Sequence, residues 1–140
     1  MAGLTPTRYN DATIEDFTWL ADFNGLEEAE SGTLHAASLR VAGGHRKENW
    51  LRSGTPLGKI TAAGATKGQF GLYDPAATDG RQFHYGFLKA EIQLVDNVTG
   101  VENTPLSGAV LNQGQILVAR LPVAFDPALA SVNTRHFIYR

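Results

Sequence analysis

Apolar side chains recur in short runs between residues 53 and 94, and turn residues separate the runs. The runs at 57–62, 70–73 and 83–87 have the length of strands, and glycines and prolines lie between them, so each predicts a strand. In the third run every second residue is aromatic, which predicts a strand with one buried face. The segment therefore predicts a β scaffold of short strands and tight turns.

The residue types of this segment also predict its turns. Ser53-Gly54 precedes the first strand, Asp74-Pro75 ends the second, and Asp79-Gly80 precedes the third. Asp-Gly is among the strongest local turn signals, because glycine supplies a positive φ and aspartate bonds its own backbone. The same chemistry accounts for both aspartates, which could otherwise be read as a catalytic acid pair.

Further strands are predicted on both sides of this segment, at 33–42, 109–111, 116–119 and 136–139. The polar residues 112–114, Asn-Gln-Gly, predict a hairpin between the second and the third of these strands. The pattern therefore continues in β structure almost to the end of the chain.

One short helix is predicted near the C-terminus. Asp126 suits the N-cap position and Pro127 the first helical position, so the following residues 128–132 are expected to form one or two turns. No internal repeat and no second hydrophobic unit is visible in the sequence. The expected fold is a single, mainly β domain with little helix.

Residues 1–33 differ in composition from residues 34–140, so we interpret them as an N-terminal arm before the β domain. They carry seven of the fourteen acidic residues, and Arg8 is their only lysine or arginine. Gly3 and Pro6 favour an extended course at the start of the arm. The arm is therefore expected to be acidic and extended.

The arm is also rich in aromatic side chains. Residues 13–21 fit a short helix and a strand equally well, because apolar residues recur at both spacings. Phe17, Trp19 and Phe23 would each cost roughly 1.5–3 kcal/mol if left in water. These rings are expected either to fold back on the domain or to bury against a partner.

Composition and charge narrow the possible classes of function. The 140 residues suit one domain, and a net charge of −2 gives no basic field for nucleic acid or an anionic membrane surface. No apolar run approaches the length of a membrane span. The absence of cysteine excludes disulfides, thiolate metal sites and cysteine nucleophiles.

A local excess of positive charge follows the arm. Residues 31–53 carry four cationic side chains against one carboxylate, a net charge of +3; they are Arg40, Arg46, Lys47 and Arg52 against Glu48. This cluster predicts either a solvated loop or a patch complementary to an acidic protein surface, such as the acidic arm of a neighbouring subunit.

Signatures of catalysis or cofactor binding do not emerge. Residues 54–61, GTPLGKIT, approach a phosphate-binding loop, but three residues separate the glycines instead of four and Ile60 follows the lysine. The four histidines are scattered without metal-ligand spacing, and no serine lies in a nucleophile elbow. We therefore expect no enzyme activity, no cofactor and no metal.

Three stretches of the central segment resemble the head decoration proteins of lambda-type tailed bacteriophages. They are SGTPLGKIT at 53–61, YDPAATDG at 73–80, and Gly86-Phe87-Leu88. A similar order of turn, strand, turn and strand recurs in that family. The resemblance covers residues 53–94 well, and the strand expected at Leu34–Val41 and residues 125–140 more loosely.

The resemblance implies a small β-barrel or β-tulip-like domain, residues 34–140, that assembles as a homotrimer. Such a trimer would sit on the outer surface of the expanded head at local three-fold positions, bind the major capsid protein, and stabilise the head against internal DNA pressure. It would belong to the virion, pass through the host cytoplasm during assembly, and bind neither nucleic acid nor membrane.

In such proteins the N-terminal arm becomes ordered on the shell, partly by adding a strand to a coat-protein segment. Here the arm is longer, more acidic and more aromatic than is usual in the family. From position and chemistry we expect capsid contacts from Thr5, Pro6, Tyr9, Phe17 and Trp19. The alternative is a small β-barrel adaptor or binding module elsewhere in the phage particle, in the tail or a fibre.

Overall fold

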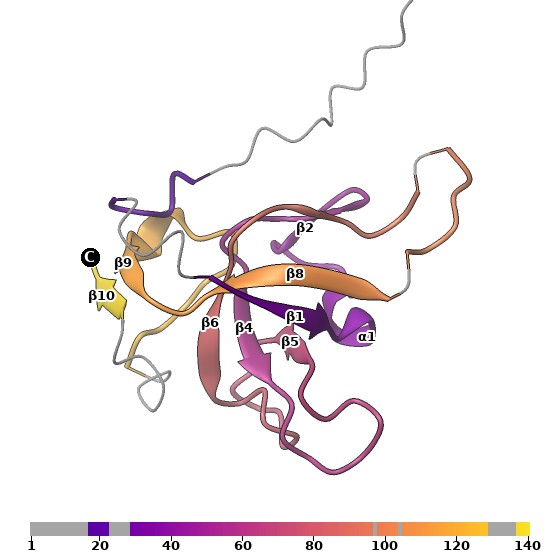
Figure 1. Cartoon of the computed structure of the whole chain (residues 1–140). Helices are drawn as coiled ribbons and strands as arrows, with labels where there is room; N and C mark the ends of the chain where they lie inside the picture. The colour runs from indigo at the N-terminus through magenta and orange to yellow at the C-terminus, as the bar shows by residue number, and fades with distance from the viewer. Residues whose placement is uncertain (1–16, 23–28, 97, 104, 129–136) are drawn as a thin grey trace, which may run out of the picture.

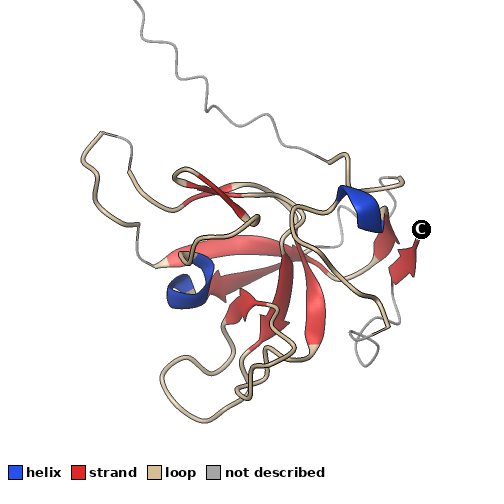
Figure 2. Ribbon diagram, turned by 180° about the vertical axis from the view of Figure 1, so that it is seen from behind, coloured by secondary structure: helices blue, strands red, loops and turns tan. Residues whose placement is uncertain are grey.

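The computed structural model describes residues 17–22, 29–96, 98–103, 105–128 and 137–140. The protein is mainly β, with 35% of the described residues in strands and 6% in helices (Figures 1 and 2). Its centre is a small closed barrel, so the predicted fold class is confirmed. No helix within the described ranges has the length and apolarity needed to span a membrane.

Five strands close the barrel in the order β1-β5-β4-β6-β8. They are β1 (Glu30–Leu34), β4 (Pro56–Lys59), β5 (Phe70–Leu72), β6 (His84–Leu88) and β8 (Leu106–Leu111). Neighbouring strands are antiparallel except β1 and β5, which meet in parallel at Leu34 and Phe70. Closure pairs both edges of the sheet, which removes the free edges through which β proteins aggregate.

Two smaller sheets flank the barrel. The first is antiparallel and joins β2 (Arg46–Lys47), β3 (Trp50–Leu51) and β7 (Ile92–Gln93). The second is a parallel pair of β9 (Gly114–Ile116) and β10 (Phe137–Tyr139), close to the C-terminus (Figure 1).

Helical structure in the described chain is confined to two short elements. They are the α-helix α1 (Ala36–Leu39) and a 3-10 turn, η3 (Val118–Arg120). In both ribbon views α1 lies at one end of the barrel, and the β9–β10 pair lies towards the opposite side (Figures 1 and 2).

Buried side chains form two clusters, which we call the barrel core and the aromatic cap. The barrel core is mostly aliphatic: Leu34, Leu39, Leu51, Leu57, Phe70, Leu88, Leu94, Leu106 and Val110. The aromatic cap contains Trp19, Leu20, Phe87, Leu111, Ile116, Phe125 and Phe137. The cap joins residues near both ends of the chain to the barrel.

A β-bulge in β6 distributes that strand between the two clusters. On β4, Leu57 pairs with Gly86 and Gly58 pairs with His84, so Tyr85 has no partner directly opposite. The extra residue puts His84 and Phe87 on one face, with ring centroids 4.6 Å apart, while Tyr85 packs against the barrel core.

The bulge explains one wrong prediction. The strand predicted at 83–87 exists as β6, but its aromatic residues do not share one buried face. Phe87 is fully buried in the cap, Tyr85 faces the core, and Phe83, just before the strand, is 45% exposed. Period two fails here because a bulge shifts the alternation by one residue.

Other predicted elements also differ from the structure. Residues 33–42 do not form one strand: β1 ends at Leu34, and the Ala-Ala-Ser-Leu that follows forms α1, with Arg40 N–H bonded to Ala36 O at 2.9 Å. Alanine and leucine favour helix, and this local preference outweighed the apolar pattern.

The hairpin predicted at 112–114 is also wrong. The strand β8 pairs with β1 and β6, whereas β9 pairs with β10, so the two successive strands turn into different sheets. Residues 117–119, expected as strand, largely form the 3-10 turn η3. The predicted C-terminal strand is present as β10, and the helix predicted at 128–132 falls mostly outside the described residues.

Candidate functional site

The residues expected to contact a capsid fall into two groups. Thr5, Pro6 and Tyr9 lie outside the described residues. Phe17 is half-buried against the aromatic cap, and Trp19 is only 1% exposed. Of the two fates predicted for the aromatic residues of the arm, Trp19 therefore takes the first and folds back on its own domain.

Trp19 is held from several sides. Its indole Nε1 donates a hydrogen bond to Ser53 Oγ at 3.0 Å, and its ring centroid lies 5.6 Å from that of Phe87. Its backbone carbonyl accepts from Leu117 N–H at 2.7 Å. A Cβ on Gly54 would approach the ring to 2.9 Å, so only glycine fits beneath it. The side chain is therefore a structural anchor in this conformation.

The first barrel strand, β1, begins within residues 1–33, the range that the sequence assigned to the arm. Residues 30–33 belong to β1 and pair with β8 along their whole length. The Glu30 carboxylate accepts hydrogen bonds from Tyr85 Oη at 2.8 and 2.9 Å and from Asn112 Nδ2 at 3.1 Å. The acidic character of Glu30 thus serves the barrel and not an arm.

The local excess of positive charge forms a structured hairpin, which we call the basic hairpin: β2, β3 and their turn, together with Arg52. In register, Lys47 lies opposite Trp50, and Trp50 lies opposite Gln93 of β7. Leu51 is fully buried in the barrel core, so the alternation of β3 directs Trp50 and Arg52 to the opposite face. The sequence identified these cations. The register shows that Lys47 and Arg52 lie on the face of Trp50, whereas Arg46 lies on the face of Leu51.

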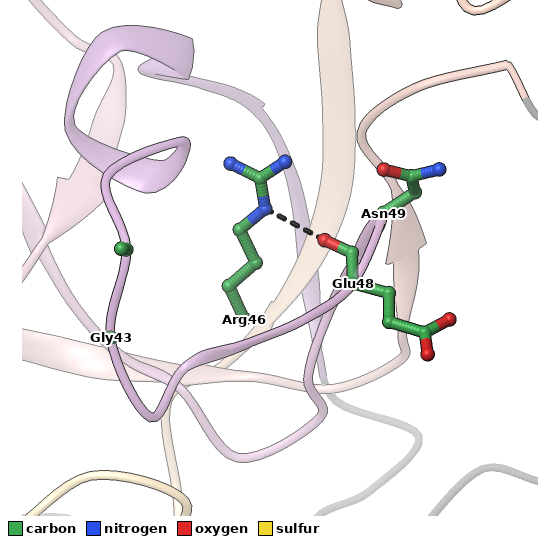
Figure 3. A pocket seen from close by; sticks show the side chains of 5 residues that line it. Gly43, Arg46, Glu48 and Asn49 are labelled. Atoms are coloured by element: carbon green, nitrogen blue, oxygen red, sulfur yellow. Dashed lines mark hydrogen bonds between the residues drawn. The ribbon is translucent and has the colours of Figure 1, made fainter.

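Arg46 shapes the hairpin turn. Its Nη1 donates to the carbonyl oxygen of Arg40 at 2.5 Å, and its Nε donates to the carbonyl oxygen of Glu48 at 2.8 Å (Figure 3). Glu48 adopts a φ of 54°, which is uncommon for a residue with a side chain. The bond from Arg46 supports this turn, and the Glu48 carboxylate points away from the guanidinium (Figure 3).

An open hollow of about 480 Å³ lies beside the hairpin. Ala42, Gly43, Arg46, Glu48 and Asn49 line it. The lining therefore combines a guanidinium and a carboxylate with backbone and amide groups, which is chemistry suited to a hydrogen-bonding partner.

Most of the positive charge of the hairpin is left without a carboxylate partner. Arg40 pairs with Glu102 at 3.2 Å, but within the described residues no carboxylate lies within ion-pair distance of Arg46, Lys47 or Arg52. Arg52 Nη1 instead donates to Gly44 O at 3.2 Å. Backbone carbonyls position these side chains without neutralising them, so the hairpin presents net positive charge.

His45 precedes this cluster but does not add to its charge. It is buried, and its Nε2 lies 3.0 Å from the carbonyl oxygen of Leu39, which requires an Nε2–H donor. Burial lowers its pKa, and the neighbouring Arg46 acts in the same direction. The basic patch therefore depends on arginine and lysine alone.

A serine and a histidine meet elsewhere, at α1. His35 Nδ1 lies 3.0 Å from Ser38 Oγ, and burial lowers the pKa of His35. The same oxygen accepts a hydrogen bond from Leu72 N–H at 3.1 Å, and Ser38 is largely buried. These bonds fasten α1 to β5, which accounts for the pair as a structural contact. Sequence reasoning missed it because residues 33–42 were interpreted as a strand.

Metal chemistry has no visible centre in the part of the chain that the structure describes. No three His, Asp or Glu side chains gather there as a metal ion would require. The near-match to a phosphate-binding loop, residues 54–61, enters the barrel strand β4 and not a helix. The basic hairpin is therefore the candidate site with the clearest chemistry.

Comparisons of this chain with protein-family models, with curated protein sequences and with solved structures find no match.

Proposed function

We propose that this chain is a structural protein of a phage head. It binds as a homotrimer to the outer surface of the expanded capsid at local three-fold positions, contacts the major capsid protein, and stabilises the shell against internal DNA pressure. One observation carries the proposal: residues 53–94, which resemble head decoration proteins, supply three of the five barrel strands together with the turns between them.

The fold is suited to this role. A closed barrel lacks free strand edges, so it can be added to a particle surface in many copies without polymerising. A specific contact needs on the order of 800 Å² buried on each partner. Segments that precede the barrel add such area, and three of them in a trimer raise the effective concentration of the later contacts.

The burial of Trp19 limits which residues we propose for the capsid contact. Trp19 is enclosed by its own domain, so the proposed contact segment consists of Thr5, Pro6, Tyr9 and the half-buried Phe17. An extended segment of this kind binds best by adding a strand to the partner. The protein would function on the virion exterior and reach it from the host cytoplasm.

Co-sedimentation with heads of the phage that encodes the chain tests this proposal. We expect saturable binding to expanded heads that lack decoration, and none to unexpanded heads. A variant without residues 1–16 should keep the barrel spectrum and lose binding. If the intact protein ignores expanded heads and binds isolated tails or fibres, it is an adaptor and the proposal fails.

A further inference from the structure

The first sixteen residues and the basic hairpin have opposite charge. Asp11, Glu15 and Asp16 lie in the segment just before the described structure begins at Phe17. Three cations of the hairpin, Arg46, Lys47 and Arg52, have no ion-pair partner within the described residues. The charges match in number and sign.

The chain enters the described structure next to this hairpin. Trp19 is bonded to Ser53 and covers Gly54, and Ser53 follows Arg52 directly in the sequence. The backbone of residues 19–21 is hydrogen-bonded to residues 115–117, and from there the Trp19 side chain reaches Ser53, directly after the end of the hairpin. Proximity of this kind gives a high effective concentration without any partner molecule.

The fold places Lys47, Trp50 and Arg52 on one face of the hairpin. Lys47 is exposed and lies opposite the half-buried Trp50, and Arg52 lies on the same side of β3 as Trp50. The Arg46 guanidinium lines the adjoining hollow of about 480 Å³ (Figure 3). An extended acidic segment could place carboxylates over the cations and apolar atoms over the indole.

The acidic segment of residues 11–16 is long enough to lie along the basic hairpin. Residues 11–16 span at most about 20 Å when fully extended, at roughly 3.3–3.6 Å per residue. A two-residue turn joins β2 and β3, so Lys47 and Arg52, which lie on the face of Trp50, are only a few residues apart. Arg46 pairs with Leu51 and lines the hollow beside them.

We propose that the basic hairpin binds the acidic segment of residues 11–16 of its own chain, as an electrostatic clasp. This inference does not rest on the proposed function, because it concerns the isolated chain. It predicts a contact that salt weakens, since the Debye length falls from about 10 Å at about 0.1 M salt to about 3 Å at about 1 M.

A spin label tests the clasp directly. The chain has no cysteine, so Ala12→Cys gives a single labelling site inside the acidic segment. At low salt we expect a nitroxide at this position to broaden the backbone amide signals of residues 46–52. The variant K47E/R52E should reduce the broadening by about three- to tenfold, as expected for the loss of two exposed ion pairs.

A matched control separates the patch from overall charge. K47E and K67E each reverse one exposed cation, and K67E, in the loop between β4 and β5, should leave the broadening unchanged whereas K47E should reduce it. Chemical shifts away from the substituted sites report whether each variant remains folded.

Three outcomes would overturn the clasp. The first is no broadening of residues 46–52 at low salt. The second is equal loss of broadening in K47E and K67E. The third is equal broadening of isotope-labelled chains without a nitroxide when they are mixed with spin-labelled chains, because the segment would then bind a second copy. Capsid binding is measured separately, so failure of either idea leaves the other standing.

Discussion

The barrel core and the aromatic cap meet along β6 and β8 but are assembled in different ways. Leu88 and Val110 enter the core, and their chain neighbours Phe87 and Leu111 enter the cap. The core is mainly aliphatic and is supplied largely by strands of the closed sheet. The cap gathers rings from segments far apart in sequence. The barrel is therefore a self-contained unit, and the cap attaches the chain ends to it.

The two clusters also differ in the polar groups that they bury. The cap encloses His84, whose ring lies 4.6–5.7 Å from the rings of Phe87, Phe125, Phe137 and Tyr73. His84 is fully buried, and neither ring nitrogen makes a hydrogen bond of normal geometry; the backbone of Gly86 is the one polar group that acts on the ring, and it raises the pKa while burial lowers it more. A buried ring of this kind costs about 1–3 kcal/mol. The cap thus combines strong aromatic packing with a built-in weakness that the barrel core lacks.

Truncation of adjacent residues on β6 should separate the clusters most strongly. Phe87→Ala should cost about 3–5 kcal/mol and Leu88→Ala about 2–5 kcal/mol, because both side chains are fully buried. Amide exchange should show that Phe87→Ala exposes β9, β10 and residues 17–22 before the barrel, whereas Leu88→Ala weakens all barrel strands together. Uniform loss of protection in both variants would mean that the clusters form one unit.

Acid should weaken the cap through His84. Burial lowers the pKa of His84 from 6.5 to about 4, so the unfolded chain binds the proton at a higher pH than the folded chain does. The free energy of unfolding is therefore fully retained above pH 6.5 and falls as the pH drops from 6.5 towards 4, by roughly 3 kcal/mol in total.

Urea titrations of the wild type and His84→Leu at neutral pH and near pH 4 measure this effect. Leucine removes the buried ring nitrogens at similar volume, so the variant should be as stable as wild type, or more so, at neutral pH. Carboxylates titrate in both proteins, so the difference between them isolates His84. An identical acid loss in both proteins would exclude this histidine as the weak point.

Two glycines test how firmly the cap holds the arm. Gly54 and Gly68 have nearly the same φ, 88° and 89°, but a Cβ at Gly54 meets Trp19 at 2.9 Å whereas one at Gly68 meets nothing within 4 Å. Gly68→Ala should cost about 1–2 kcal/mol through backbone strain alone. Gly54→Ala should cost about 2–4 kcal/mol, because the methyl group also displaces the indole.

Thermal unfolding and tryptophan fluorescence report on these glycine variants. Only Gly54→Ala should shift the emission of Trp19 to longer wavelength. Equal destabilisation in both variants would show that Trp19 moves aside without loss.

The smallest expected effect concerns the bond between Tyr85 and the carboxylate of Glu30. Burial, followed by the hydrogen bond to Glu30 and the charge of that carboxylate, raises the pKa of Tyr85 to about 12. Tyr85→Phe should therefore cost about 1 kcal/mol, measured by chemical denaturation, because Asn112 still bonds the carboxylate. A loss of several kcal/mol would instead place Glu30 among the main supports of the barrel.

Local signals predicted much of the barrel. The turn at Asp79-Gly80, the strands that became β4 and β5, and the C-terminal β10 follow from residue types and short-range periodicity. The mainly β character follows from the same features. Such signals act within a few residues, so a single sequence displays them.

Long-range choices were not predictable in this way. Nothing local in β9 states that it pairs with β10 instead of β8, and the bulge at Tyr85 depends on the register with β4. The burial of Trp19 likewise depends on Ser53 and Gly54, over thirty residues away. The cations of the basic hairpin were visible in the sequence, but the faces on which they lie were not, because the register decides that Lys47 lies with Trp50 and Arg46 with Leu51.

Electron cryomicroscopy gives the most direct test of our proposal that this protein decorates an expanded phage head. Undecorated expanded heads of the phage that encodes the chain would be mixed with the purified protein and imaged. We expect new three-lobed density at the local three-fold positions of the outer surface. Bare heads, or density found only on the tail or fibres, would contradict it.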